Sequence, residues 1–557
     1  MKIQYLKLYN KYRSLEPFEY RFLKHPLLKD KIDPICLVGL NGSGKSNFLE
    51  LISDIFYEIE VFFLYTNKLY LEDSPKYFPY SNNKTKEPIF FHIEYEISVN
   101  NKPETIKIIR TKKDSSIKFY IKSESQDIFN ENVFNILDNS IARNYLPLLV
   151  SYTSGLNDLL TLPYVDLQDY YAQQVAFEAL SNSHQQKNIL SPNLLLLNYD
   201  SNAAIVISNF LLADQKKKNI FQNNLRISGM NSFRIVIRLN KLFGNKKVKV
   251  TNELQAYIQQ LNDCASLANV KVDNNKGNEY VFDFIVNKTT IELFKDKFGS
   301  VQKLFEALTK LNLLNTLCIQ SKYKDLLRKK REKGQLIKFP QIASLDKIFS
   351  IENIELILNK PNLRTEYEKI SDGEHQFIHI LGGILLFDRE NSEREILYLL
   401  DEPDTHFNPL WRSDFFYQME TILVNKSVEF IVTTHSPFIL SDCHGYNVFK
   451  FKREGDKVTF ERVEKETYGA TYENVTESIF DPNTENYKHF DSRIAKLSYL
   501  DIEKLHQELN SINSKEEWLE KTDNLMSRIR MLGESIDRLY LLKQFTDCQE
   551  KYTQDSI

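Results

Sequence analysis

Apolar and polar residues alternate along the first part of the chain, a pattern that is typical of strands with one buried face. Residues 3–9 show this alternation, and we predict that they form the edge strand of a sheet. Further on, turn-forming Asn, Pro, Lys and Asp residues separate three apolar-rich runs, at 89–99, 105–110 and 117–121. These runs predict an antiparallel meander, and another short strand is predicted at 147–152.

The pattern changes between residues 155 and 345. This segment is rich in Asn, Leu and Lys and predicts mostly helices joined by irregular loops. It shows no repeat of fixed period and no sustained heptads, which argues against a long coiled-coil arm. Alternation returns at 348–358, and a hairpin is predicted at 447–463 with its turn at Gly455. The charged, periodic tail at 500–545 predicts a pair of amphipathic helices.

A glycine-rich loop follows a short apolar run, Ile35–Val38, and precedes a segment that can begin a helix. Its residues 39–46, Gly-Leu-Asn-Gly-Ser-Gly-Lys-Ser, match the phosphate-binding pattern G-x-x-x-x-G-K-[ST]. The glycines let backbone N–H groups wrap a phosphate, and the helix N-terminus adds a favourable dipole. Lys45 would reach the β- and γ-phosphates, and Ser46 would bind Mg²⁺. The predicted nucleotide-contacting residues of this loop are Asn41, Gly42, Ser43, Gly44, Lys45, Ser46 and Asn47.

A glycine-rich turn that matches this pattern by chance is the alternative, and the strand and helix on either side disfavour it.

Two carboxylates end a second apolar run. Residues 396–400 read as an apolar strand that is followed directly by Asp401 and Glu402. Because parallel strands present their C-terminal ends at one edge of a sheet, Asp401 is expected beside the phosphate loop, where it can bind Mg²⁺. Glu402 can act as the general base that polarises the attacking water. Acidic loops after strands are common, so this assignment depends on the pairing with the phosphate loop.

A third apolar run, 430–432, ends in the polar sequence Thr-Thr-His-Ser-Pro. His435 lies 33 residues after Glu402 and is predicted to donate a hydrogen bond to the γ-phosphate. An isolated histidine in such a place is more often an ordinary loop residue, but this setting favours a role in catalysis.

A helix start precedes the second carboxylate strand. Ser371 is a suitable N-cap for a helix predicted at 376–387, and Glu374 lies three residues later, as in a capping box. That structural role is compatible with a functional one, because exposed N–H groups at a helix start can receive a phosphate from another molecule.

Together these segments resemble the ATP-binding-cassette ATPase head shared by SMC, RecF and overcoming-lysogenization-defect (OLD) proteins. The resemblance depends on four ordered elements: the phosphate loop at Gly39, Ile-Ser-Asp-Gly-Glu at Ile370, Leu-Leu-Asp-Glu-Pro-Asp at Leu399 and Thr-Thr-His-Ser-Pro at Thr433. Asp404 falls in a segment similar to the D-loop of the OLD-like branch. Arg13 resembles the arginine that follows the opening strand of that branch, which implies that it approaches the nucleotide.

The resemblance implies that ATP is sandwiched between two subunits, in a head-to-tail homodimer or a higher oligomer. Ser371 and Gly373 of one subunit would then contact the γ-phosphate bound by Lys45 of the other, and Asp404 would lie at the same interface. The signature has Asp372 where many relatives have Gly, and no glutamine is assigned to the family's Q-loop.

We therefore predict an α/β fold: a two-lobed ABC-type ATPase head in which a mixed sheet carries the phosphate loop beside an antiparallel β-subdomain. The predicted divisions are lobe I with the phosphate loop and the meander at 1–155, a mostly helical insertion at 156–345, lobe II with the remaining motifs at 346–470 and a helical C-terminal tail at 471–557.

Composition excludes several other classes. The 557 residues are too many for one ordinary domain, and with 42% hydrophobic and 26% charged residues the chain can build large cores rather than remain disordered. The net charge of −3 leaves any nucleic-acid contact to a local patch. The five cysteines form no C-x-x-C pair, which argues against a zinc ribbon. No apolar stretch is long enough for a membrane helix, so we expect no membrane partner and a cytoplasmic location.

The family also suggests what the ATPase acts with. OLD nucleases carry a Toprim domain with an Asp-x-Asp pair, and because this sequence lacks such a pair we predict no intrinsic nuclease. The pattern is most similar to stand-alone ATPase subunits of bacterial anti-phage systems, such as restriction-system-associated AAA family ATPases and the Septu ATPase subunit, which acts with an HNH nuclease. The expected protein is an ATP-hydrolysing dimer, with ATP and Mg²⁺ as cofactors, that regulates a partner nuclease.

Two alternatives stay open. A DNA-repair ATPase of the RecF type would bind DNA directly, and the densest basic run, between Lys322 and Lys333, can serve such a contact, although a solvated helix face is the more common explanation. A scaffold that uses ATP only as a structural clamp would bind ATP tightly without turnover, which the complete set of catalytic residues disfavours.

Overall fold

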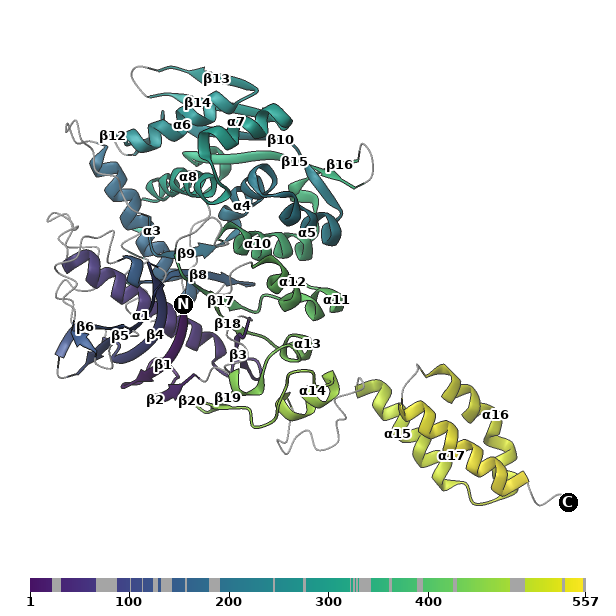
Figure 1. Ribbon diagram of the computed structural model, residues 1–557. Coiled ribbons are helices and arrows are strands. Elements are labelled where there is room, and N and C mark those ends of the chain that lie inside the picture. The colour runs from purple at the N-terminus through teal and green to yellow at the C-terminus, as the bar shows by residue number, and fades with distance from the viewer. Residues whose placement is uncertain are drawn as a thin grey trace. The chain divides into compact units, whose positions relative to one another are not determined.

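The computed structural model describes the chain except residues 23–31, 67–87, 101, 113, 124–128, 132–142, 156–157, 180–190, 244–245, 274–276, 321, 324–325, 327–328, 330–341, 360–362, 388–393, 424–427, 481–495, 533–535 and 554–557. The chain divides into two compact units, Met1–Gly469 and Ala470–Ile557 (Figure 1). Each unit has a hydrophobic core of its own.

A seven-stranded sheet carries the phosphate loop of the first unit. Its strands, in spatial order, are β20 (Lys457–Arg462), β19 (Val448–Glu454), β3 (Ile35–Val38), β18 (Val428–Thr433), β17 (Ile396–Asp401), β8 (Leu148–Thr153) and β9 (Leu194–Leu197). Neighbouring strands are parallel except β19 and β20, which form the predicted hairpin. Every residue of β3, β17 and β18 is buried. Strands covered on both faces have continuous apolar runs, which explains why the sequence identifies them.

A six-stranded antiparallel sheet contains the predicted meander. Its order is β2 (Phe18–Arg21), β1 (Lys2–Leu8), β4 (Phe91–Val99), β5 (Lys102–Thr111), β6 (Asp114–Ser123) and β7 (Asn130–Glu131). The prediction that residues 3–9 form an edge strand is wrong, because β1 pairs with β2 on one side and with β4 on the other. The sequence analysis did not identify the short β2, although its four residues alternate between aromatic and charged side chains.

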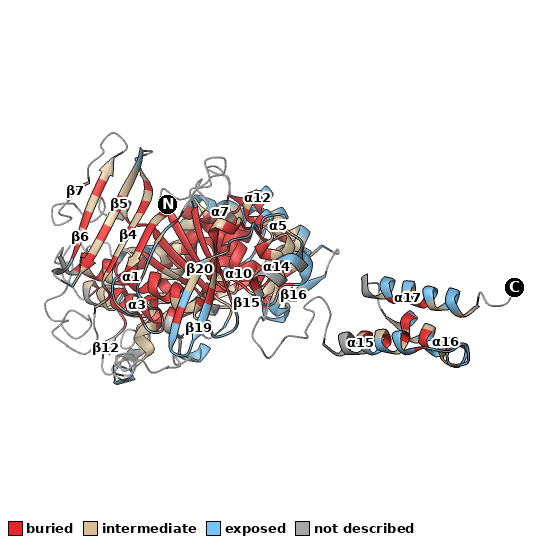
Figure 2. Ribbon diagram, turned by 90° about the horizontal axis from the view of Figure 1, so that it is seen from below, coloured by how far each residue is buried: buried red, intermediate tan, exposed pale blue. Residues whose placement is uncertain are grey.

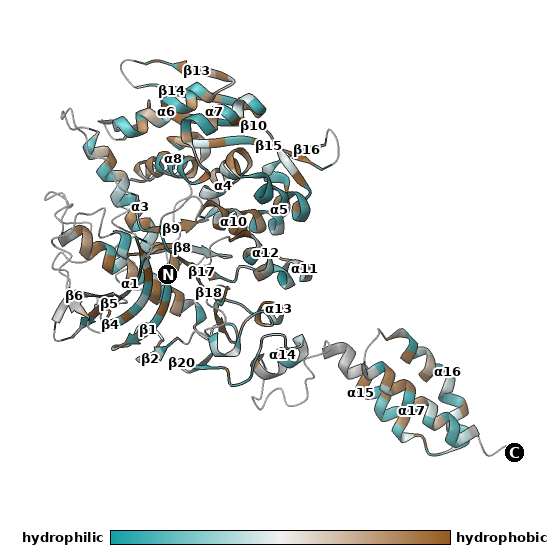
Figure 3. Cartoon of the chain, in the orientation of Figure 1, coloured by the Kyte–Doolittle hydropathy of each residue, from teal (hydrophilic) through white to brown (hydrophobic). Residues whose placement is uncertain are grey.

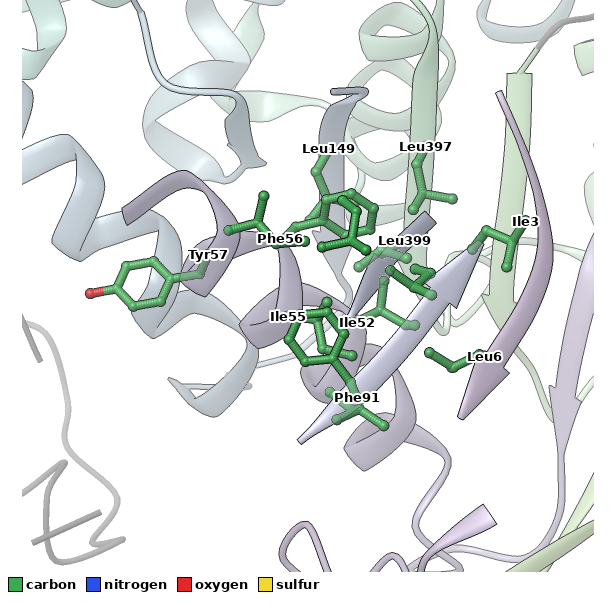
Figure 4. Close-up of a cluster of buried hydrophobic side chains, with 14 of the residues drawn as sticks. Ile3, Leu6, Ile52, Ile55, Phe56, Tyr57, Phe91, Leu149, Leu397 and Leu399 are labelled. Carbon is green, nitrogen blue, oxygen red and sulfur yellow. The ribbon is translucent and has the colours of Figure 1, made fainter. Parts of the chain in front are cut away.

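Helix α1 (Lys45–Thr66) joins the cores of these two sheets (Figure 4). Its side chains at 52, 55 and 56 belong to one buried cluster with residues of both sheets: Ile3, Leu6, Phe91, Leu149, Leu397 and Leu399. Burial of each such side chain stabilises the fold by roughly 1.5–3 kcal/mol. The helix that begins at Lys45 is therefore held firmly in place.

The sequence predicts a mostly helical insertion at 156–345, but the described part of this segment also contains strands. Its helices are α3 (Asp158–Glu178), α4 (Tyr199–Leu212), α5 (Gln215–Leu225), α6 (Asn252–Cys264), α7 (Lys288–Phe298) and α8 (Val301–Leu313). Its strands are β9 together with β10 (Ile227–Arg238), β11 (Leu242–Phe243), β12 (Lys246–Lys247), β13 (Leu267–Lys271) and β14 (Glu279–Ile285).

Three of these strands build a five-stranded antiparallel sheet with two strands from lobe II. The order is β13, β14, β10, β15 (Phe349–Leu358) and β16 (Arg364–Glu366). β10 is interrupted by Gly229 and by the polar pair Asn231 and Ser232, so its alternation is visible only from Phe233 onward. Side chains cap the helices that cover this sheet: Asn198, Asp214, Thr251, Asn287 and Ser300.

Lobe II contributes helix α10 (Asp372–Leu386) and the short helices α11 (Pro409–Ser413), α12 (Phe415–Ile422) and α13 (Pro437–Leu440). Helix α10 packs closely against the insertion at Gly382 and Gly383. A Cβ atom on Gly382 would lie 2.7 Å from the side chain of Ile205 in α4, and one on Gly383 would lie 2.6 Å from the side chain of Leu197 in β9. Short 3₁₀ helices lie at Arg143–Tyr145, Leu314–Cys318, Ser344–Asp346, Tyr367–Lys369 and Gly445–Asn447.

The second unit is helical, with α14 (Tyr472–Phe480), α15 (Lys496–Ser511), α16 (Lys515–Met531) and α17 (Ile536–Thr553). The sequence predicts a pair of amphipathic helices at 500–545, whereas the structure has three helices, α15 to α17, around one core. Figure 2 shows buried and exposed residues on different sides of these helices, and Figure 3 shows the matching change from hydrophobic to hydrophilic positions. Trp518 is only 1% exposed and is the largest side chain of this core.

No helix in the described part of the chain is long and apolar enough to cross a membrane. A largely parallel sheet with the phosphate loop, an antiparallel sheet beside it and covering helices confirm the predicted α/β fold class.

Candidate active site

Four polar segments meet at one edge of the seven-stranded sheet. Because β3, β18, β17 and β8 are parallel neighbours, their C-terminal ends lie at the same edge. Asp401 of β17 is directly opposite both Thr433 of β18 and Thr153 of β8. The phosphate loop after β3, the carboxylates after β17 and His435 after β18 are thereby brought together.

The phosphate loop adopts backbone conformations that only its glycines adopt without strain. Gly39, Gly42 and Gly44 have φ angles of 146°, 78° and 98°. A Cβ atom on Gly44 would lie 2.8 Å from the side chain of Val458, and one on Gly39 would lie 2.6 Å from the Phe451 carbonyl oxygen. The loop therefore packs closely against the β19–β20 hairpin, and its glycines allow the backbone to turn toward the start of α1.

Lys45 is the buried cation of the site, with 5% of its surface exposed. Its Nζ atom donates to the carbonyl oxygen of Gly39 at 3.0 Å and lies 2.8 Å from Nε2 of His435. Burial lowers the pKa of Lys45 to about 8, and the carboxylates of Glu402 and Asp401 oppose this shift. The ammonium group lies where the loop would bind phosphate oxygens.

Ser46 and Asp401 form a pair suited to a divalent cation. The Ser46 hydroxyl donates to Oδ1 of Asp401 at 3.1 Å, across 355 positions of sequence. Thr433 donates to the same oxygen at 2.8 Å, and Thr153 donates to Oδ2 at 3.3 Å. These hydroxyls fix the orientation of the carboxylate. A hydroxyl and a carboxylate are oxygen ligands of the kind that Mg²⁺ binds together with phosphate oxygens.

Glu402 has an unusual backbone conformation, with a φ angle of 50°. Its N–H group donates to the Thr433 hydroxyl at 2.9 Å, which holds this turn in place. Nε2 of His435 lies 3.3 Å from Oε1 of Glu402, and this hydrogen bond lowers the pKa of the Glu402 carboxyl. Non-glycine residues with positive φ cluster at functional sites, because the surrounding structure must compensate for their strain.

His435 has contacts on both sides through the same nitrogen, Nε2. Accepting from the ammonium of Lys45 requires Nε2 without a proton, whereas donating to Glu402 requires Nε2 with one. The two contacts therefore belong to two tautomers, and the side chain can respond to a change at either neighbour.

The site fits a magnesium–nucleotide. The Ser43 hydroxyl is buried in the loop and has no hydrogen-bond partner among the described residues, so a phosphate oxygen can accept from it. Among those residues no cluster of three or more His, Cys, Asp or Glu side chains could hold a metal ion alone. A cation at Ser46 and Asp401 would complete its coordination with phosphate oxygens and water.

The other predicted residues of this lobe lie around the loop. Arg13 forms an ion pair with Glu50 on the second turn of α1, so its guanidinium is engaged beside the loop. The amide of Asn47 donates to the Ser14 hydroxyl. Asn41 and Gly42 are exposed at the tip of the loop.

Ser371 and Gly373 occupy the start of α10. The Ser371 hydroxyl accepts from the N–H of Glu374 at 3.3 Å, and Glu374 accepts in return from the N–H of Ser371 at 2.9 Å, which forms the predicted capping box. Ser371 is exposed and Gly373 is half-buried. The side-chain hydrogen bonds of Ser371 in the described part of the chain are with Glu374.

Asp404 lies inside the chain. Its carboxylate accepts from the hydroxyl of Thr434 at 3.1 Å and lies 3.6 Å from the guanidinium of Arg412. It is 5% exposed, and this burial raises the pKa of Asp404. In this structure the side chain holds its own loop together.

Three threonines at this edge do not emerge from the sequence analysis. Thr433 holds Asp401 and Glu402, Thr434 holds Asp404, and Thr153 holds the other oxygen of Asp401. The two adjacent threonines before His435 are a signal that a reader of the sequence could use. Thr153 has no such signal, because its role depends on the strand register alone. The basic run between Lys322 and Lys333 is mostly outside the described residues, and Lys322 and Lys329 within it are exposed.

Part of the chain is similar in sequence to known proteins. A sequence model of the family described as "AAA domain, putative AbiEii toxin, Type IV TA system" matches residues 319–441. A protein of Escherichia coli named Retron Ec83 probable ATPase is 28% identical over 135 residues, which are 23% of this chain and 24% of that protein. Over these residues the chain is similar to AbiEii-type AAA domains and to a retron ATPase, as expected for an SMC/RecF-like ATPase related to defence ATPases. This confirms the resemblance inferred from the sequence. The match spans about a quarter of the length of the retron protein.

Two solved SMC structures are also similar at a low level. The SMC head domain from Thermotoga maritima is 11% identical, covering 84% of this chain and all of that one, with a TM-score of 0.30. A structure of the SMC head bound to the C-terminal winged-helix domain of ScpA is 10% identical, covering 83% of this chain and 99% of that one, with a TM-score of 0.30. Scores of this size do not establish a shared arrangement of elements.

Proposed function

We propose that the chain binds and hydrolyses magnesium–ATP at this edge of the sheet. The observation that carries the proposal is the convergence of Ser46 and Asp401, whose oxygens lie 3.1 Å apart although 355 positions separate them in the sequence. Lys45 directly precedes Ser46, and Glu402 directly follows Asp401. The contact between Ser46 and Asp401 therefore brings together a cation that can bind phosphate, two oxygen ligands for a metal ion and a general base.

Each side chain has a chemical task in this proposal. Lys45 binds the β- and γ-phosphates, and the backbone N–H groups of the loop bind the remaining oxygens. Glu402 accepts the proton of the attacking water, and its lowered pKa keeps it ionised for that purpose. His435 lies between Lys45 and Glu402 and orients both. Ser46 and Asp401 would hold Mg²⁺, which would supply positive charge against the negative charge that develops on the phosphates.

We propose further that two copies close head to tail around two nucleotides. Ser371 and Gly373 support this, because they lie at the N-terminus of a 15-residue helix, where Ser371 is exposed. A helix N-terminus with accessible N–H groups binds anions. The γ-phosphate held by Lys45 of one subunit is therefore the ligand for the start of α10 of the other.

The cellular role we propose is anti-phage defence, in which the ATPase regulates or directs a partner nuclease such as an HNH enzyme. The retron relative and the description of the matching family support this choice over a RecF-like ATPase that binds DNA directly. The two roles differ in one measurement. Affinity purification of the native complex would recover a nuclease in the first case, and the isolated chain would bind DNA with steep salt dependence in the second.

Substitution of the general base tests the enzymatic proposal. Glu402→Gln keeps the shape of the side chain and removes the base, so turnover should fall by at least about 100-fold while ATP still binds and dimers accumulate. Glu454→Gln, on an exposed position of β19, is the matched control. Unchanged turnover in the Glu402 variant would remove this residue from its role, and an absence of turnover in the unmodified chain would reject the ATPase proposal itself.

A further inference from the structure

A buried glutamine lies between the start of α10 and the two strands that carry the site. Gln376 is 3% exposed. Its Nε2 group donates to the hydroxyl of Tyr152 at 3.1 Å, and its Oε1 atom accepts from the N–H of His406 at 2.9 Å. Buried amide side chains need partners at both ends, and here both partners belong to segments far away in the sequence. Gln376 follows the Ser371 cap by five positions, so it is fixed to the same helix start.

The first turn of α10 and the backbone at His406 are in close contact. A Cβ atom on Gly373 would lie 2.7 Å from the carbonyl oxygen of His406. The N–H of His406 faces Gln376, so both backbone groups of this residue face the helix. The rings of Phe377 and Phe407 lie 6.0 Å apart and extend the contact by one residue on each side. A movement of this loop must therefore move the start of α10.

The same loop is attached to the acidic residues of its own site. Thr405 donates to the carbonyl oxygen of Glu402 at 2.9 Å and lies 3.2 Å from the hydroxyl of Ser154. Asp404 is held by Thr434, next to His435. The loop that contacts α10 is thus the loop that begins at the proposed general base.

The other partner of Gln376 leads to the metal pair. Tyr152 is the penultimate residue of β8, and Thr153 beside it donates to Oδ2 of Asp401 at 3.3 Å. Tyr152 also packs against His379, one turn along α10, with ring centroids 5.3 Å apart. Gln376 therefore connects α10 with both carboxylate-bearing positions, through His406 to Glu402 and through Tyr152 to Asp401.

We propose that Gln376 is a positioning residue that couples the nucleotide site of a subunit to the Ser371–Gly373 surface that the same subunit offers to its partner. Nucleotide bound at Asp401 and Glu402 sets the position of β8 and of the His406 loop. Because Gln376 is hydrogen-bonded to both, a shift of either also shifts the start of α10. In a dimer, nucleotide binding at one ATP site would then affect the other ATP site. This inference rests on the proposed function, because it concerns the same ATP sites.

Three substitutions separate the two links. Gln376→Leu removes both hydrogen bonds. Gln376→Glu keeps an acceptor for the N–H of His406 and reverses the other hydrogen bond, because the Tyr152 hydroxyl can donate to a carboxylate. Tyr152→Phe removes only that second link. The matched control is Asn209→Leu in α4. This substitution removes a buried amide that donates to the carbonyl oxygen of Gly382 in α10 at 3.1 Å but does not touch the His406 loop.

The experiment measures ATP turnover, ATP-driven dimerisation and hydrogen exchange of the His406 amide in the full-length chain. In Gln376→Leu we expect kcat to fall about 10-fold with a KM change below about threefold, and sigmoidal ATP dependence to become hyperbolic. The His406 amide should exchange faster in this variant and stay protected in Gln376→Glu and Tyr152→Phe. Tyr152→Phe, which removes one link, should have an intermediate kcat value.

Each result has a defined meaning. Wild-type kcat and dimerisation in Gln376→Leu would overturn the inference, and so would an equal loss in Asn209→Leu, because that would show general destabilisation of α10. Rapid exchange of the His406 amide in the unmodified chain would overturn it as well, whether or not ATP is hydrolysed. An unmodified chain without ATP turnover but with a protected His406 amide would instead reject the proposed function.

Discussion

The hydroxyl of Thr433 donates to Oδ1 of Asp401 at 2.8 Å, deep in the sheet where Thr433 is fully buried. The same hydroxyl accepts the N–H of Glu402 at 2.9 Å. One side chain therefore orients the proposed metal ligand and holds the strained backbone of the proposed base. Because Ser46 donates to the same oxygen of Asp401, the orientation of this carboxylate also decides how the phosphate loop meets β17.

Thr433→Val should impair the metal pair and the base together. Valine has the same shape, but it leaves the N–H of Glu402 without the hydroxyl and lets the Asp401 carboxylate rotate. Loss of a buried hydrogen-bond partner costs about 1–3 kcal/mol of stability. We expect a higher Mg²⁺ concentration at half-maximal turnover and a lower kcat. Thr433→Ser keeps the hydroxyl and should restore both values, whereas Thr434→Val removes only the link to Asp404. A Mg²⁺ dependence that is equal in Thr433→Val and the unmodified chain would contradict this role.

Nucleotide affinity should depend on pH through Lys45. Burial lowers its pKa to about 8 in the free protein, so the ammonium that binds phosphate is present below this pH and is lost above it. Phosphates are already ionised in this range, so affinity should fall as pH rises from about 7 to about 9.5, with bound nucleotide raising the pKa of Lys45 in turn. Equilibrium titration with a fluorescent nucleotide measures this. Lys45→Ala should bind weakly with a flat profile, and a flat profile in the unmodified chain would contradict the assignment.

The sequence predicts those strands whose burial produces either a continuous apolar run or a regular alternation of apolar and polar residues. Strands β3, β17 and β18 are buried along their whole length and appear as short apolar runs, and β4 alternates buried and half-buried residues without a break. The insertion was harder, because all five residues of β13 are exposed and so no alternation marks this strand. Its position depends on pairing with β14, a tertiary contact that local sequence does not encode.

The site shows the same limit. Lys45, Asp401 and His435 stand in segments whose chemistry is visible in the sequence, and the structure brings them together. The threonine partners of Asp401 depend on register, since Thr433 and Thr153 face it only because β18 and β8 pair with β17 at those positions. Gln376 is a further case, because its partners lie 224 and 30 positions away.

Gly373 is required for close contact rather than for an unusual backbone angle. A Cβ atom there would lie 2.7 Å from the carbonyl oxygen of His406, so Gly373→Ala must displace either the loop or the start of α10. Overpacking of this kind costs about 1–3 kcal/mol, and we expect lower ATP turnover and weaker ATP-driven dimerisation with less effect on nucleotide binding by the phosphate loop. Gly229→Ala in β10 is the control, because the nearest atom to its Cβ is 4.0 Å away. Full dimerisation and turnover in Gly373→Ala would contradict the expectation.

Trp518 should stabilise the second unit without influence on the nucleotide site. Its indole is 1% exposed and packs on Phe545, with ring centroids 4.8 Å apart, inside a core made only of residues of that unit. Trp518→Ala should lower the stability of this unit by about 3–5 kcal/mol, because the cavity cannot close fully. Nucleotide affinity should stay unchanged, since the core beneath the phosphate loop is separate. Leu519→Ala, one position away and 66% exposed, is the control. Limited proteolysis should therefore cut the region 496–553 faster in the first variant only, and equal protection of both would show that Trp518 does not support this core.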